Sequence, residues 1–484
     1  MTEIKELEPK TVWGFFEEIT RIPRPSKREG KMIAWLEAFA REHGLECRKD
    51  AAGNVVIVKP ATSGRELSPT VVLQSHMDMV CEKNGDVEFD FDRDPIRAYV
   101  DGEWVKARGT TLGADCGIGM AAALALLVSQ DIPHGKIEAL FTVDEETGLT
   151  GAFGLGEGML TGKYLINLDS EDEGEIFIGC AGGIDTVAVF TYHMEPCPER
   201  YAGFRISVKG LTGGHSGDDI DKGHANSNKL LDRFLWNGAR KFGLRMARFD
   251  GGNLRNAIPR EAEALFAVPA DREEALKDYF RDFSRMILEE YEHTERKAEF
   301  GLEPSAVKEV LDRESQDALL NCLYAVPNGV LAMSRTMEGL VETSSNLASV
   351  KFGEGNRIVV TTSQRSSLES AKYDAMAAVE SAFLLGGARV THSEGYPGWT
   401  PDPSSELLKI VRETYEELFG TEPKVRAIHA GLECGLFLQK YPQLEMVSFG
   451  PTLRGVHSPD ERLEIASVEK FWKLLVGTVE RIVG

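Results

Sequence analysis

Short apolar segments alternate with one long apolar, helix-like segment in the first third of the chain. The pattern predicts three buried strands at residues 71–73, 136–143 and 164–168, with a helix at 117–129. Strands that alternate with helices favour an α/β fold, here a mixed, mostly parallel sheet flanked by helices. Because functional groups in such sheets gather outside the carboxyl ends of the strands, we expect the chemistry at that edge.

The middle of the chain has a different pattern, in which strands surround amphipathic helices. We predict strands at 204–208, 262–268 and 357–362, and helices at 226–242 and 369–385. A proline-rich segment follows at 396–403, and after it come a helix at 405–419 and a strand at 446–449. This second pattern is typical of an α+β domain that is separate from the first.

The two patterns together predict a two-domain chain. Residues 1–184 and 397–484 form the first domain, and an α+β domain at 185–396 is inserted into it. Within the inserted domain, the segment that starts at Leu254 faintly resembles the one that starts at Ser345. This similarity is a weak indication of an internal duplication.

Composition and charge exclude some classes of function. The 484 residues carry 55 Lys+Arg against 77 Asp+Glu, a net charge of −22, which disfavours nucleic-acid and membrane partners in the absence of a basic patch. The first ten residues are charged and lack the apolar core of a secretory signal. No C-x-x-C pair occurs among the seven cysteines. We therefore expect a cytoplasmic protein with reduced thiols.

Candidate ligands for a metal follow the predicted strands. His76 and Asp78 end the first strand, where residues i and i+2 share one face, although a solvated pair would look the same. Asp115 lies in a glycine-rich turn before the helix, where it could cap the helix or let a metal approach. The turn lacks the Lys-Ser/Thr of a phosphate loop, so phosphate binding is poorly supported.

Further acidic residues follow the next two strands. Glu145 and Glu146 come after the second, where consecutive side chains of an extended chain point in opposite directions, and Asp169 ends the third. A solvated acidic loop is the alternative. His76, Asp115, Glu146 and Asp169 would bring three carboxylates together, which requires a compensating cation. His457, in a Gly/Pro loop after the last strand, is the best second histidine.

These motifs resemble, in order and spacing, those of a known family. The stretches are His76-x-Asp78, Gly113-Ala-Asp115, Asp144-Glu-Glu-Thr-Gly, Leu168-Asp169, Gly213-Gly-His215-Ser-Gly and Gly455-Val-His457. They are similar to those of the co-catalytic dizinc peptidases that include carboxypeptidase G and aminoacylase. Longer stretches, at 75–83, 112–119 and 429–435, are most similar to the dipeptidases of that family.

The resemblance implies a role for each metal-site residue. Asp115 bridges two zinc ions, for which manganese or cobalt could substitute because carboxylate-rich sites are permissive. His76 and Asp169 complete one site, and Glu146 and His457 complete the other. The two remaining acids would act next to the metals: Glu145 as the general base and Asp78 as the carboxylate that orients His76.

The inserted domain and one later loop supply the residues expected to bind the substrate. By resemblance, His215 donates a hydrogen bond to the reacting carbonyl, and Asn256 and Arg365 hold the substrate carboxylate. Ser363 stands where relatives have the Asp of Asp-x-Arg, so the match at Arg365 is imperfect. Glu433 could bind a free α-amino group or could be an exposed structural residue.

The expected function is hydrolysis of short peptides, with Xaa-His dipeptides among the substrates, by a zinc-activated water. The rivals are an N-acyl-amino-acid deacylase of the same clan and, more distantly, a non-catalytic metal-binding scaffold; phosphate-ester hydrolysis lacks a basic cluster. The inserted domain would close as a lid and deliver His215. The protein would be a homodimer, or a monomer whose duplicated lid mimics one.

Overall fold

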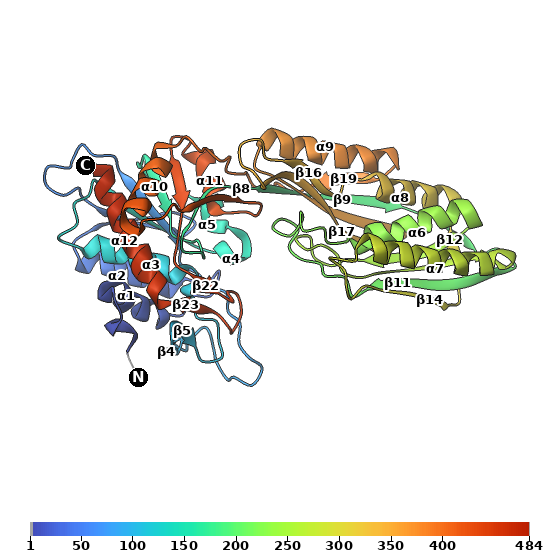
Figure 1. Cartoon of the computed structure of the whole chain (residues 1–484), viewed down its shortest axis with the longest axis horizontal. Helices are drawn as coiled ribbons and strands as arrows, with labels where there is room; N and C mark the ends of the chain where they lie inside the picture. The colour runs from blue at the N-terminus through green and yellow to red at the C-terminus, as the bar shows by residue number, and fades with distance from the viewer. Residues whose placement is uncertain (1–2, 484) are drawn as a thin grey trace. The chain divides into compact units, whose positions relative to one another are not determined.

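The computed structural model describes residues 3–483. Its internal contacts divide the chain into two compact units. Unit 1 contains the chain up to Gly179, Pro401–Ala427 and the chain from Leu432 onward, and unit 2 contains Cys180–Thr400 and Ile428–Gly431. The residue colours of Figure 1 show that unit 1 combines both ends of the chain, whereas unit 2 is a continuous middle stretch with one short addition.

Unit 1 is built on an eight-stranded mixed sheet. Its four central strands β6, β3, β7 and β21 are parallel, and β2 and β8 join them antiparallel at either side. The sheet is therefore parallel only at its centre. In spatial order the strands are β1 (Glu46–Lys49), β2 (Val55–Lys59), β6 (Ile137–Thr142), β3 (Val71–His76), β7 (Tyr164–Asn167), β21 (Glu445–Ser448), β8 (Glu175–Cys180) and β20 (Lys424–Ile428).

Helices flank this sheet. Helix α3 (Ala114–Val128) is an Ala/Leu-rich segment in which 13 of 15 residues are buried, as expected of a helix that is apolar on all sides. It packs between α1 and the strands β3 and β6. The others are η1 (Ile4–Glu6), α1 (Lys10–Thr20), α2 (Gly30–Glu42), α4 (Glu145–Gly148), α5 (Thr150–Gly154), α10 (Glu406–Phe419), α11 (Glu433–Lys440) and α12 (Ile465–Val483). A small sheet contains β22 (Leu453–Arg454), β23 (Arg462–Glu464), β5 (Trp104–Ala107) and β4 (Ala98–Asp101).

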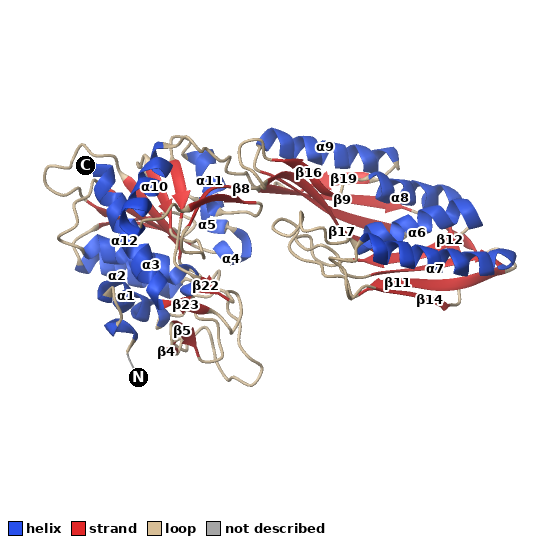
Figure 2. Cartoon of the chain, viewed as in Figure 1, coloured by secondary structure: helices blue, strands red, loops and turns tan. Residues whose placement is uncertain are grey.

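Unit 2 is a nine-stranded sheet with four long helices packed along it (Figure 2). The strands run β14 (Glu299–Pro304), β11 (Tyr201–Lys209), β13 (Ala262–Pro269), β12 (Arg245–Gly251), β17 (Val341–Gly353), β18 (Arg357–Ser366), β9 (Gly182–Thr191) and β19 (Arg389–His392), with β16 (Gly329–Met333) beside β17. The helices are α6 (Ser227–Phe242), α7 (Glu273–Glu290), α8 (Arg313–Ala325) and α9 (Glu369–Leu385). The remaining elements are β10 (Met194–Pro196), β15 (Glu309–Leu311) and η2 (Ala270–Arg272).

The two halves of unit 2 share one topology. In chain order the first half is β11–α6–β12–β13–α7–β14, and the second is β9–α8–β17–β18–α9–β19. Within each half, the first strand lies between the third and the fourth, and the second strand lies beyond the third. The halves meet through their second strands, β12 and β17, where Gly251 lies opposite Val350.

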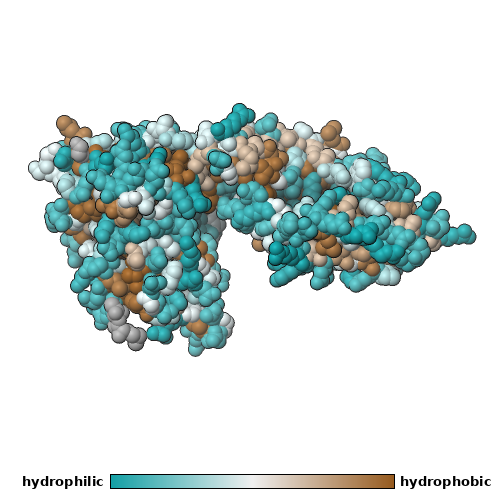
Figure 3. Space-filling model, viewed as in Figure 1, coloured by the Kyte–Doolittle hydropathy of each residue, from teal (hydrophilic) through white to brown (hydrophobic). Residues whose placement is uncertain are grey.

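The surface of the protein is mostly hydrophilic. Hydrophilic side chains cover most of the face drawn in Figure 3, with apolar side chains only in small areas. Within residues 3–483, every helix is too short or too polar to span a lipid bilayer.

Candidate active site

The carboxyl ends of the four central parallel strands carry the predicted metal ligands. His76 is the last residue of β3, and Glu145 and Glu146 follow β6. Asp169 follows β7, and His457 lies beyond β21, in the loop between β22 and β23. This is the edge at which side chains from neighbouring parallel strands converge.

Asp115 lies between the two histidines. Its Oδ1 is 3.0 Å from Nε2 of His76, and its Oδ2 is 3.2 Å from Nε2 of His457. Asp169 Oδ1 is 3.3 Å from the same nitrogen of His76, and Glu146 Oε2 is 3.0 Å from that of His457. The cluster therefore consists of two imidazole–carboxylate groups that share one carboxylate.

The electrostatics of the cluster favour cations. Hydrogen bonds that His457 donates to Asp115 and Glu146 raise the pKa of His457 to about 11, and burial raises the pKa of Asp169 to about 6. Within residues 3–483, the buried Oε1 of Glu146 has no hydrogen-bond partner, and Oδ1 of Asp169 has only the 3.3 Å contact with His76. Three carboxylates and two imidazoles, which give up a proton when a metal binds, form a donor set that fits two divalent cations.

Asp78 connects His76 to the turn that carries the two glutamates. Its Oδ1 is 3.4 Å from Nδ1 of His76 and accepts the backbone N–H of Glu145 at 3.0 Å. Its Oδ2 accepts from Ser26 Oγ at 2.7 Å and from the backbone N–H of Glu146 at 3.3 Å. Burial acts to raise the pKa of Asp78, but the hydrogen bonds from His76 and Ser26 lower it to about 2. A carboxylate in this position fixes both the imidazole and the turn.

Glu145 and Glu146 lie in a backbone conformation different from the one expected. They do not lie on extended chain but begin the short helical turn α4, after Asp144 takes a left-handed conformation with φ of 49°. The expectation of strand alternation is therefore wrong, and a carboxylate oxygen of each glutamate lies within 4.8 Å of the other and of a ring nitrogen of His76. Burial, followed by the charge of Asp169, raises the pKa of Glu145 well above its ordinary value.

Asp115 does not cap helix α3, contrary to one interpretation of the sequence. The N-cap position is Gly113, with φ of 69° and no side-chain cap. The carboxylate of Glu461 accepts the backbone N–H groups of Leu112, Gly113, Ala114 and Asp115 at 2.7 to 3.3 Å. Because Glu461 satisfies these donors, the carboxylate of Asp115 is left for the two histidines.

Two residues that hold this geometry were not found from the sequence. Arg24 is buried and donates to the carbonyl oxygens of Met77, Asp78 and Gly113, so it ties the end of β3 to the Asp115 turn. Glu461 lies only four residues after His457, and this short distance in sequence is the one feature that could have identified it as part of the site. Nothing in the local pattern at Arg24 indicated its contacts, which are more than 50 residues away in the chain.

Glu433 begins α11 and is only 2% exposed, so it is not a surface residue. Its Oε2 accepts from Gln74 Nε2 at 2.6 Å and from Thr142 Oγ1 at 2.8 Å. Its Oε1 has no hydrogen-bond partner within residues 3–483, and burial raises the pKa of the carboxyl to about 8. The carboxyl group thus keeps one buried oxygen for a further donor.

His215 belongs to unit 2 and has a defined tautomer. Its Nδ1 accepts the backbone N–H groups of Gly217 at 3.3 Å and Asp218 at 3.2 Å. Burial, together with the charge of Arg365, lowers the pKa of His215. The imidazole is therefore neutral near pH 7, with its proton on Nε2, and it can donate one hydrogen bond.

Arg365 and Asn256 also lie in unit 2. Arg365 is on β18, is 6% exposed and donates from Nη1 to the Tyr396 hydroxyl at 2.9 Å. No carboxylate within residues 3–483 forms an ion pair with it, although the charge of Arg365 acts on the carboxyl group of Asp218. Asn256 is exposed in the loop after β12, where its carbonyl accepts the N–H of Ser216. This bond places the Asn256 loop beside the loop that carries His215.

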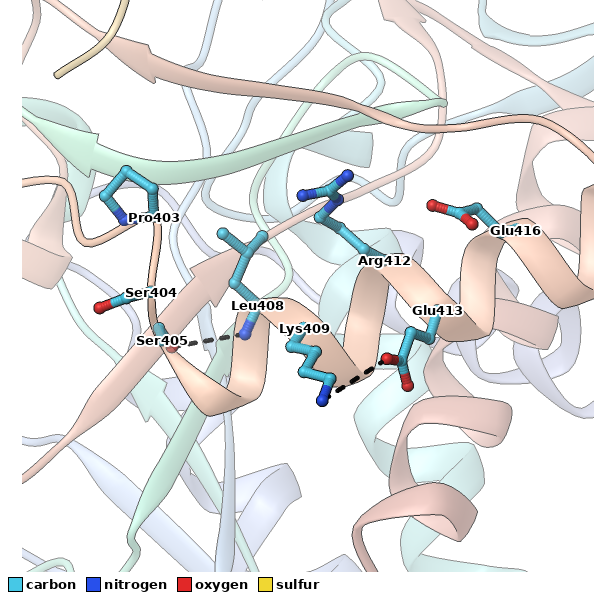
Figure 4. A pocket seen from close by; sticks show the side chains of 8 residues that line it. All are labelled: Pro403, Ser404, Ser405, Leu408, Lys409, Arg412, Glu413 and Glu416. Carbon is cyan, nitrogen blue, oxygen red and sulfur yellow. Dashed lines mark hydrogen bonds and ion pairs between the residues drawn. The ribbon is translucent and has the colours of Figure 1, made fainter.

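A separate hollow of about 480 Å³ runs along α10 (Figure 4). It contains none of the candidate site residues. Lys409 and Glu413 form an ion pair of 3.9 Å on its floor, and Ser405 accepts the N–H of Leu408 at the helix start. These contacts are those of an ordinary solvated helix surface.

The fold and the donor set define the class of metal-dependent hydrolases with two adjacent cation positions. The chain belongs to peptidase family M20/M25/M40, which residues 72–481 match. The resemblance seen in the sequence and the α/β fold class are thereby confirmed.

Individual relatives extend over the whole chain. The cytosol non-specific dipeptidase of Escherichia coli (strain K12) is 45% identical over 483 residues, which cover 100% of this chain and 99% of that protein. The crystal structure of aminoacylhistidine dipeptidase from Vibrio alginolyticus has 46% identity and a TM-score of 0.93, covering 99% of this chain and 98% of that one. An aminopeptidase from Bacillus cereus, at 17% identity and a TM-score of 0.58, covers 99% of this chain and 100% of its own and shares the fold alone.

Proposed function

We propose that the protein is a metal-dependent dipeptidase of the cytosol with broad specificity, which cleaves Xaa-His dipeptides among others. The observation that carries this proposal is the carboxylate of Asp115, with one oxygen toward each histidine of the cluster. The names of the Escherichia coli and Vibrio alginolyticus relatives support the substrate class.

Two cations would be held by the shared cluster. His76, Asp169 and Asp115 would bind one, and Glu146, His457 and Asp115 would bind the other. Zinc suits these nitrogen and oxygen donors, and manganese or cobalt would be accepted as well. When bound, such a pair of cations lowers the pKa of water and polarises a carbonyl group.

Glu145 would move the proton. It would take a proton from the attacking water and pass it to the amine that leaves, which is general acid–base catalysis. Its raised pKa suits this exchange, because the carboxyl group can hold the proton between the two steps. Asp78 would keep both His76 and the Glu145 turn in place through its four contacts.

Four residues would recognise the substrate. The buried guanidinium of Arg365, which has no carboxylate partner in the described chain, would bind the substrate carboxylate, with Asn256 as a second donor. His215 would donate its Nε2 proton to the carbonyl oxygen as negative charge develops there. Glu433 would accept the free α-amino group with its unpartnered Oε1.

A panel of substrates tests the proposal against its rival. Metal-stripped protein, with and without added zinc, would be incubated with Ala-His, β-Ala-His, Leu-Gly, a tripeptide and an N-acetyl amino acid. Zinc-dependent cleavage of dipeptides alone supports the dipeptidase. Turnover of only the acetylated compound would make the protein a deacylase, and inactivity with both cations bound would leave a metal-binding scaffold.

A further inference from the structure

The guanidinium of Arg365 is held by a neutral group. It donates from Nη1 to the hydroxyl of Tyr396 at 2.9 Å, and its Nε has no partner within residues 3–483. A buried guanidinium usually pairs with a carboxylate, which orients it and also neutralises it. A phenol oxygen orients the group and adds no negative charge, so that the opposing charge comes from Asp218, which forms no ion pair with it.

The ring of Tyr396 is fixed between two glycines. A Cβ on Gly183 would lie 2.7 Å from the ring Cζ and hydroxyl, and a Cβ on Gly431 would lie 2.8 Å from Cε2. Real Cβ atoms do not approach so closely, so both positions need glycine for the ring to fit. The hydroxyl oxygen therefore has a defined position.

The backbone of Tyr396 is fixed as well. Its N–H donates to the carbonyl of Gly183 at 2.8 Å, and its own carbonyl accepts the N–H of Gly183 at 3.0 Å. The same carbonyl accepts from Nζ of Lys372 at 2.8 Å. Tyr396 thus holds the guanidinium from a rigid segment that is paired with β9.

The hydroxyl stays neutral and keeps its own proton. Burial raises the pKa of Tyr396, so the phenol is not ionised near pH 7. Because its oxygen accepts from Arg365, its O–H is left to donate elsewhere. An incoming carboxylate would meet both a guanidinium that has no ion-pair partner within residues 3–483 and a hydroxyl donor.

We propose that Tyr396 is a positioning residue that aims Arg365 at the terminal carboxylate of the substrate without neutralising it. This inference rests on the proposed function, in which Arg365 binds that carboxylate. We further infer that Tyr396 enables the protein to distinguish a peptide with a free C-terminal carboxylate from one with an uncharged C-terminus.

Binding without turnover tests this directly. In zinc-loaded protein with Glu145→Gln, calorimetry would give the dissociation constants of Ala-His and of its C-terminal amide. We expect Tyr396→Phe to reduce the preference for the carboxylate about tenfold, the value of one hydrogen bond to a charged group. The matched control is Tyr373→Phe on α9, where the tyrosine is 47% exposed, and it should leave the preference unchanged.

A double-mutant cycle separates positioning from packing. Once Arg365 is replaced by Ala, adding Tyr396→Phe should change nothing further, because the two residues act as a pair. In the otherwise unchanged enzyme, Tyr396→Phe should raise KM for Ala-His while kcat stays within about twofold, the pattern for loss of uniform binding.

Two results would overturn the proposal. One is an unchanged carboxylate preference in Tyr396→Phe, and the other is an equal loss of affinity for acid and amide, which would indicate a general structural role. The binding ratio does not depend on hydrolysis. If the protein cleaved no dipeptide but Tyr396→Phe still reduced its preference for Ala-His over the amide, the proposed activity would be refuted and the positioning role supported.

Discussion

At the scale of single residues, three carboxyl groups make separable contributions to the metal cluster and its surroundings. Glu145 would handle the proton, Glu461 holds the backbone of the Asp115 turn through four N–H groups, and Glu433 lies buried against Gln74 and Thr142. The sequence predicted the first, and it offered the third as either an amine-binding or an exposed residue. It missed the second because the position of Glu461 near His457 does not indicate that its partners lie in a turn about 350 residues earlier.

Glu145→Gln should abolish proton transfer while sparing metal binding. We expect kcat for Ala-His to fall about 10²- to 10⁴-fold, the usual contribution of a general base. The amide keeps the size of the side chain, so the content of two zinc ions per chain should persist by elemental analysis. Glu157→Gln, on the surface, serves as the control, and a kcat near wild type in Glu145→Gln would assign the base elsewhere.

Glu461→Gln should loosen the Asp115 turn. The side-chain NH₂ of the glutamine would face backbone N–H groups of the turn, which cannot accept its hydrogen bonds. The negative charge that now accepts from four backbone N–H groups would also be lost. Urea unfolding should show a loss of about 2–3 kcal/mol, as for a disrupted set of charged hydrogen bonds, together with weaker zinc binding. Asp460→Asn at the exposed neighbouring position should do neither. Unaltered stability in Glu461→Gln would mean that the turn is held without this residue.

Glu433 should give metal-free protein a pH-dependent stability. Burial raises its pKa to about 8, from an ordinary 4.5, so between these values the folded chain holds a proton that the unfolded chain has released. The free energy of unfolding contributed by Glu433 is therefore present below pH 4.5 and is lost as pH rises toward 8. Relative to wild type, Glu433→Gln should gain stability from pH 5 to pH 8 in urea titrations, and a constant difference would contradict the buried, protonated carboxyl.

At the scale of elements, the sequence pattern predicted the helices and strands whose apolar residues follow a clear period. The observed β3, β6, β7, α6 and α9 match the predicted segments closely, because apolar runs and amphipathic periods are visible in sequence. The sequence predicted a mixed sheet but not which of its strands are antiparallel, because strand pairing depends on contacts distant in the chain. The shared topology of the two halves of unit 2 supports our proposal of an internal duplication, which is only weakly indicated by the similarity of the segments at Leu254 and Ser345.

Lys229 of α6 provides an element-level test in unit 2. Its Nζ donates to the carbonyls of Leu323, Tyr324 and Val326 at the end of α8, at 2.6 to 3.1 Å. Lys229→Met should leave these carbonyls unsatisfied and lower the stability of unit 2 by about 2–3 kcal/mol. Calorimetry would measure the loss, with Lys209→Met at an exposed strand position as control. An unchanged melting temperature would show that the hydrogen bonds from Lys229 to the last carbonyls of α8 do not stabilise unit 2.

At the scale of the whole molecule, the two units should respond differently to metal. All the candidate ligands lie in unit 1, so bound cations should stabilise that unit by mass action, by about 4 kcal/mol at a concentration 1,000 times the dissociation constant. Scanning calorimetry should show one transition that moves down on chelation and another that does not. Lys229→Met should lower the temperature of the transition that does not respond to chelation, because this transition belongs to unit 2. A single transition that moves as a whole would mean that the units unfold together.

The central claim is that two cations bound around Asp115 are required for dipeptide hydrolysis. Its most direct test is a zinc titration of the metal-stripped protein, with the rate of Ala-His cleavage followed at each addition. We predict no turnover without metal and a rate that reaches its plateau at two zinc ions per chain. Cleavage by fully stripped protein, or a plateau at one ion with the second having no effect, would contradict the account.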